Sequence, residues 1–160
     1  MRLIDSFRTG FSFGLTSGII TTLGLMVGLH AGTHSRLAVI GGVLTIAIAD
    51  AFSDALGIHI SEESESRHTQ AEIWASTIFT FLTKFIIAIS FLLPVLFLEL
   101  SVAMLVSIIY GLILIGLFSY YVAKIDKSNP WPVIFEHVMI TTVVIVLTHY
   151  VGDWISTLFV

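Results

Sequence analysis

The chain has 160 residues, of which 56% are hydrophobic and 11% are charged, and its mean hydropathy is +1.01. Soluble domains contain about 45–50% apolar and about 25% charged residues, so this composition excludes an ordinary soluble protein. The absence of cysteine excludes disulfides and thiolate metal sites, and a net charge of -4 without a basic patch argues against nucleic acid as a partner. The expected partner is the lipid bilayer.

Five apolar stretches are long enough to cross a membrane, because a hydrocarbon core of about 30 Å requires about 20 residues of helix. Short polar breaks separate them. The predicted spans are 10–31, 37–60, 73–98, 101–123 and 132–157. The sequence therefore predicts an all-α polytopic membrane protein, with one transmembrane domain over residues 1–160.

Basic residues are unevenly divided between the two sides of the membrane in this arrangement. One side has only Arg36. The other side has Arg2, Arg8, Arg67, Lys124 and Lys127. Since lysine and arginine concentrate in cytoplasmic segments, we expect the N-terminus in the cytoplasm and the C-terminus on the opposite side.

Glycines form one face of the first predicted helix. At 100° per residue, a single arc contains Gly14, Gly18, Gly24, Gly28 and Gly32. Such a face lets another helix approach closely, and this is how helices gain packing energy in lipid. The partner is either another helix of the same subunit or a second subunit in a homodimer, and the glycines alone do not choose between them.

Two carboxylates, Asp50 and Asp54, lie on one face of the second predicted helix. A charge in the middle of a bilayer costs at least about 2.5–3.5 kcal/mol, so it normally faces a partner or a wet cavity. Lys84 in the third predicted helix lies at nearly the same depth as Asp50, about 15 Å from the cytoplasmic ends. The pair is either structural or part of a transport path. If Lys84 keeps Asp50 ionised, Asp54 is left to exchange protons or cations.

The polar segment after the second predicted helix carries hard oxygen ligands and an imidazole. If the helix continues, these side chains line up as a cytoplasmic intake site for a divalent ion; the alternative is a solvated acidic cap. The residues are Glu62, Glu65, His68 and Glu72.

Thr142, His149 and Asp153 share one face of the last predicted helix. We expect this polar stripe to turn toward the interior of the bundle.

Two segments carry family-like patterns: residues 13–28 read FGLTSGIITTLGLMVG, and residues 53–65 read SDALGIHISEESE. They resemble the vacuolar iron transporter family, whose first helix begins with F-G-x-x-D-G-[LIV]-[VI]-T and whose second helix contains S-M-A-x-G-E-Y-[LIV]-S-x-x-[SA]-E. Three positions differ: Ser17 replaces the family's aspartate, Asp54 its methionine and Ile58 its glutamate. A long glutamate-rich cytoplasmic segment found in some members is nearly absent here.

The resemblance implies a five-helix homodimer that moves ferrous iron or manganese out of the cytosol in exchange for protons. The family's path runs between subunits near the first helices, which places Ser17 and Thr21 along it. In this hypothesis Asp54 and Asp50 bind the metal, which is the substrate, and no resident cofactor is expected.

Two other hypotheses remain. A non-transporting scaffold or partner subunit that keeps the fold would explain the altered family positions and a carboxylate neutralised by Lys84. A proton-coupled carrier of an organic substrate would use Lys84 as its anion contact. An enzyme is not expected, because the sequence contains no nucleophile with an adjacent base and no metal-activating cluster.

Overall fold

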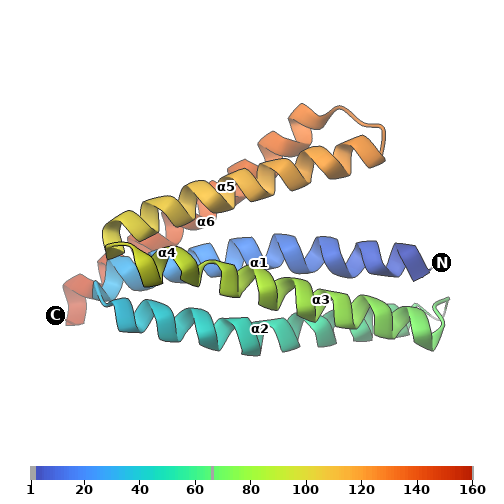
Figure 1. Ribbon diagram of the computed structural model, residues 1–160, viewed down its shortest axis with the longest axis horizontal. Helices are drawn as coiled ribbons and strands as arrows, with labels where there is room; N and C mark the ends of the chain where they lie inside the picture. Colours follow the sequence, from blue (N-terminus) through green and yellow to red (C-terminus); the bar gives the residue numbers. More distant parts are fainter. Residues whose placement is uncertain (1–2, 66, 160) are drawn as a thin grey trace.

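The computed structural model describes residues 3–65 and 67–159, and Figure 1 shows these residues as a bundle of long helices. Arg2, which contributed to the expected orientation, lies outside the described residues. The described part contains no strand. Its helices are α1 (Leu3–Thr33), α2 (Arg36–Ser64), α3 (Gln70–Ser90), α4 (Leu92–Phe97), α5 (Leu100–Ile125) and α6 (Pro130–Phe159).

Five helical segments in the described residues are long and apolar enough to cross a membrane, with α3 and α4 counted together as one. The predicted all-α, five-span fold is therefore confirmed. The helices extend one to seven residues beyond the predicted spans, except that the third span ends at Phe97, one residue before its predicted end. Apolar composition marks only the hydrocarbon-embedded part of a helix, whereas the backbone stays helical into the interface.

The third span is interrupted at Phe91, although residues 73–98 were expected to form one continuous helix. Pro94 explains the interruption: proline has no amide hydrogen, and its ring clashes with the carbonyl four residues earlier, which belongs to Ser90. The amide of Phe91 bonds to the carbonyl of Ala88, three residues back, and so tightens the last turn of α3.

Arg36 closes the end of the interrupted span. Its guanidinium donates hydrogen bonds to the carbonyl of Val95 at 3.0 Å and to that of Leu98 at 2.7 Å. The last carbonyls of a helix have no partner within the helix, so a cation at this position satisfies them. The one basic residue expected on the far side of the membrane therefore has a structural role as a helix cap.

The glycine face of α1 packs inside the subunit. A Cβ on Gly14 would lie 2.6 Å from the carbonyl oxygen of Thr80 on α3, and one on Gly24 would lie 3.0 Å from Val144 on α6. Gly28 and Gly32 likewise contact α6, and Gly18 contacts α3. Of the two partners considered for this face, the helices of the same chain are the ones that pack against it.

The two ends of the described chain lie at opposite ends of the bundle (Figure 1), as an odd number of spans requires. Toward the N-terminal end of α1, the hairpin of α5 and α6 diverges from α1, α2 and α3. The apolar core lies around the middle of α1, where Ile19, Leu23 and Met26 are completely buried together with Phe91 and Ile115.

Candidate functional site: a buried charged cluster

Lys84 lies between two carboxylates in the interior of the bundle. Its Nζ is 2.5 Å from Oδ2 of Asp50, forms a second ion pair with Oδ2 of Asp54, and donates a hydrogen bond to Oγ of Ser17 at 2.8 Å. Ser17 in turn donates to Oδ2 of Asp54 at 2.6 Å. These four residues, here called the charged cluster, join α1, α2 and α3.

Close packing of α1 on α3 positions Lys84. Gly14 and Gly18 have no side chains to separate the helices, and a Cβ on Gly18 would lie 3.3 Å from the carbonyl oxygen of Lys84. Lys84 is 14 residues from Gln70 and 13 from Phe97, which mark the ends of its span. About 20 Å of helix separates it from either end, so its ammonium cannot reach the interface by extending along the helix.

The charged cluster has one positive and two negative groups, so its formal charge is -1. A buried ammonium is tolerated only where opposite charges and hydrogen bonds replace its hydration, and the three oxygens around Lys84 do this. The contact with Asp54 belongs to a hydrogen-bonded network, whereas the one with Asp50 is an ion pair without hydrogen-bond geometry. Asp50 is therefore the less constrained carboxylate.

The charged cluster is open on one side. The Lys84 side chain is 2% exposed, while those of Asp54 and Asp50 are 18% and 29% exposed. Asp50 and Ser53 line one end of a groove of about 630 Å³ on the outer side of α1 and α2. This outer groove extends along α2 to Ala38, two residues beyond the helix start, so Asp50 is not sealed inside dry protein.

A second groove of about 550 Å³ continues from the outer groove across α1 to α6. Both are lined by Leu25, Leu29 and Ile46. Thr21, expected near the translocation path, lines the second groove and donates a hydrogen bond to the carbonyl of Ser17 at 2.8 Å. Ser17 and Thr21 thus connect the charged cluster to this outer surface of α1.

The four residues considered for metal intake do not come together as one group. Glu65 contacts Arg67 and His68, with its Oε2 3.0 Å from Nε2 of His68. Glu72 instead closes a capping box with Thr69 at the start of α3. Hydrogen bonds from His68, and then from Arg67, hold the pKa of Glu65 below its usual value. Within residues 3–65 and 67–159, no three histidine, aspartate or glutamate side chains form a group that could hold a metal ion.

Glu62 lies apart from these residues in a buried, polar environment, which the sequence pattern after the second span did not indicate. It is 6% exposed, and its Oε2 accepts a hydrogen bond of 2.5 Å from Ser76, which is completely buried with Thr80. Ser6 of α1 is also completely buried, and its hydroxyl has no hydrogen-bond partner among the described residues. The signal was available in the spacing of Ser76, Thr80 and Lys84, which places a polar row along one face of α3.

The polar stripe on α6 was wrongly expected to face inward. Thr142, His149 and Asp153 are exposed, and only 11% of the most apolar part of α6 is buried. α6 packs on α1 through its small residues, including Gly152, where a Cβ would collide with the carbonyl oxygen of Gly28. Because Gly152 lies against α1, the side of α6 that carries this glycine faces the interior and the polar stripe faces outward.

The fold and the charged cluster define a polytopic membrane protein with ionisable groups in the middle of its spans. The VIT family matches residues 11–74, a segment that contains Ser17, Asp50 and Asp54 and ends before Lys84. Over these residues the chain is similar to the VIT family. No curated protein and no solved structure matches the chain.

Proposed function

We propose that this protein carries a divalent metal ion, Mn²⁺ or Fe²⁺, across the membrane in exchange for protons, with Lys84 as the group that couples the two. The observation that carries the proposal is the position of the Lys84 ammonium between Asp50 and Asp54. The same two carboxylates are the candidate ligands for a divalent ion. The metal ion and the Lys84 ammonium therefore compete for the space between the two carboxylates.

Charge balance links metal binding to proton release. With a protonated Lys84, the charged cluster carries -1; a divalent ion added to it would bring the charge to +1 in a low-dielectric interior. If Lys84 gives up its proton, the loaded cluster is neutral. Neutrality is strongly favoured away from water, because an uncompensated buried charge costs several kcal/mol. Binding of one metal ion is thus expected to release about one proton.

The ligand set favours a hard cation. Two carboxylates and the Ser17 hydroxyl provide oxygen donors, which suit Mn²⁺ and Fe²⁺ better than copper(I). These oxygens come from only three side chains, so water or a second subunit must supply the remaining ligands. Opening of Asp50 to the outer groove provides access for both.

A homodimer fits the outer surface of α1, α2 and α6. The outer groove would be covered by a second copy, which would turn it into an enclosed path leading from Asp50. In this arrangement the N-terminus faces the cytoplasm, as the distribution of basic residues predicts.

The proposal is tested by transport into proteoliposomes loaded with a metal-sensitive dye and, separately, with a pH-sensitive dye. Wild-type protein should move Mn²⁺ with opposite proton flux, and Asp54→Asn should abolish both. The control is Glu136→Gln, which removes an exposed carboxylate near the start of α6 and should retain transport. Unchanged metal flux in Asp54→Asn would remove the charged cluster from the mechanism.

A second candidate is a non-transporting partner subunit, favoured by the Lys84 ammonium, which already pairs with both carboxylates. The two candidates differ in metal binding by the purified protein. Electron paramagnetic resonance of added Mn²⁺ distinguishes them, since a bound ion that disappears in Asp50→Asn and Asp54→Asn excludes the partner-subunit function. Absence of any bound ion would favour it.

A further inference from the structure

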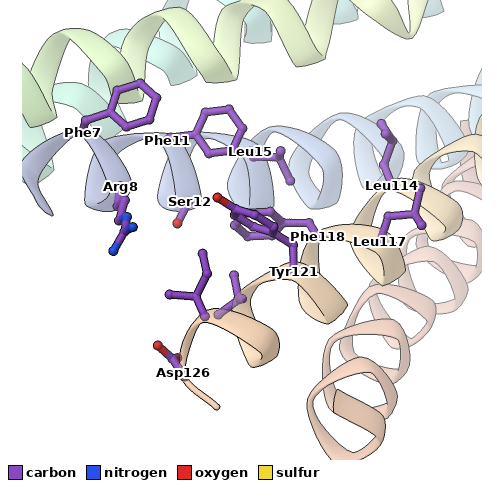
Figure 2. Close-up of a pocket in the computed structure, with 12 residues that line it drawn as sticks. Phe7, Arg8, Phe11, Ser12, Leu15, Leu114, Leu117, Phe118, Tyr121 and Asp126 are labelled. Carbon is purple, nitrogen blue, oxygen red and sulfur yellow. The ribbon is translucent and has the colours of Figure 1, made fainter. Parts of the chain in front are cut away.

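A separate cleft of about 590 Å³ lies between the N-terminal half of α1 and the C-terminal half of α5 (Figure 2). Its walls are mainly apolar and include Phe11 and Leu15 from α1 and Leu117 and Phe118 from α5. It has no residue in common with the charged cluster or with the grooves beside α2. The proposed transport function therefore leaves it unexplained.

The cleft exists because α5 approaches α1 in the middle of the bundle and then diverges (Figure 1). At the close approach, a Cβ on Gly111 would collide with the side chain of Leu23. Nearer the N-terminal end, α1 and α5 contact each other through Phe11 and Phe118, whose ring centroids are 6.0 Å apart. An apolar space open to the bilayer offers water too few hydrogen bonds, whereas a lipid acyl chain fills it without cost to polar groups.

Two opposite charges lie at the mouth of this cleft. Figure 2 shows Arg8 on α1 and Asp126 beyond the end of α5, with the cleft between them. Both residues are exposed, and the described residues include no ion pair between them. A cation and an anion on opposite sides of an apolar cleft complement a zwitterionic lipid headgroup: the guanidinium binds phosphate, and the carboxylate binds an ammonium.

We infer that the cleft between α1 and α5 binds one phosphatidylethanolamine molecule, with an acyl chain along Phe11, Leu15 and Phe118, its phosphate on Arg8 and its primary ammonium on Asp126. Phosphatidylglycerol lacks the ammonium and brings only negative charge to Asp126. Phosphatidylcholine has a quaternary ammonium that cannot donate a hydrogen bond. The charges at the mouth therefore favour ethanolamine over both.

Native mass spectrometry of the full chain, released from nanodiscs with equal amounts of the three phospholipids, tests the inference. Wild-type protein should retain one phosphatidylethanolamine per subunit. Arg8→Gln should lower retention about ten-fold, since it removes a charge-assisted hydrogen bond. Asp126→Asn should remove the preference for phosphatidylethanolamine over phosphatidylglycerol, and Leu117→Trp, which fills the cleft, should lower retention of all three lipids.

Lys124→Gln provides the matched control, because Lys124 lies near the same end of α5 but stacks over Tyr120 and does not line the cleft. This variant should retain lipid as the wild type does. Leu117 is 64% exposed, so a larger side chain is accommodated without disturbing the fold. Equal retention of all three lipids, or retention unaffected by Arg8→Gln, would overturn the inference. So would an oxidative disulfide between two copies of the Leu117→Cys variant, because the occupant of the cleft would then be protein.

Discussion

Nζ of Lys84 on α3 lies 2.5 Å from Oδ2 of Asp50 on α2, and each residue is near the middle of its membrane span. Neither charge can reach water along its own helix, so each depends on the other and on the hydrogen bonds around them. In the proposed function, the ammonium lies where the metal ion would bind, so Lys84 would compete with the metal; two of the predictions below test this competition.

Removal of the Lys84 ammonium is expected to destabilise the protein and to make it dependent on metal. Lys84→Met leaves two buried carboxylates without a cation, and losing one partner of a buried ion pair costs about 3–5 kcal/mol. Thermal unfolding in mild detergent measures the loss. Added Mn²⁺ should restore most of it, by about 2.7 kcal/mol at a concentration 100 times the dissociation constant. If Mn²⁺ stabilises the wild type and Lys84→Met equally, the two cations do not share a site.

Ser17→Asp places a third carboxylate beside Lys84 and Asp54. Metal affinity in oxygen-ligand sites rises with the number of charged ligands, so Mn²⁺ binding should tighten about ten-fold or more. Titration calorimetry measures the affinity. Ser17→Asn has nearly the same shape without the charge and should not tighten binding. Equal affinities in the two variants would show that position 17 does not contact the metal.

Gly14→Ala should destabilise the bundle by about 1–3 kcal/mol, because its Cβ would lie 2.6 Å from a backbone oxygen that cannot move aside easily. Gly116→Ala is the matched control. A methyl group on Gly116 of α5 would have no neighbouring atom within 4 Å, so alanine there should stabilise the helix by about 0.5–1 kcal/mol. Unfolding of both variants under the same conditions provides the comparison, and equal effects would contradict tight packing of α1 on α3.

Glu65 should titrate at a pH below the ordinary range of glutamate, because hydrogen bonds from His68 and Arg67 favour its charged form. With a lowered pKa in the folded state, its contribution is present at neutral pH and is lost as the pH falls through that pKa. Carbon-detected magnetic resonance of the side-chain carboxyl follows the titration. His68→Ala should raise the midpoint more than Arg67→Gln does, and an unchanged midpoint in both would contradict these contacts.

Much of the architecture follows from the sequence, because the length of an apolar stretch is a direct measure of bilayer thickness. The depths of Asp50 and Lys84 were also predictable, since helical rise is uniform. The second partner of Lys84 was not. Asp54 lies one turn from Asp50 on the same face of α2, and the packing of α2 against α3 lets one ammonium reach both carboxylates.

Which helix faces pack against each other was harder to predict from one sequence. The glycine face of α1 allowed either an internal or an external partner, and its fit to Thr80 and Gly152 decides for the interior. The same fit turned the polar stripe of α6 outward. The interruption at Phe91 followed from Pro94, a local signal that a hydropathy average does not register.

The role of Lys84 is tested most sharply by the number of protons released when Mn²⁺ binds to the purified protein in weakly buffered detergent solution near neutral pH. We expect about one proton per metal ion for the wild type and none for Lys84→Gln. Binding without proton release in the wild type, or the same release from Lys84→Gln, would contradict the role of Lys84 as the coupling group.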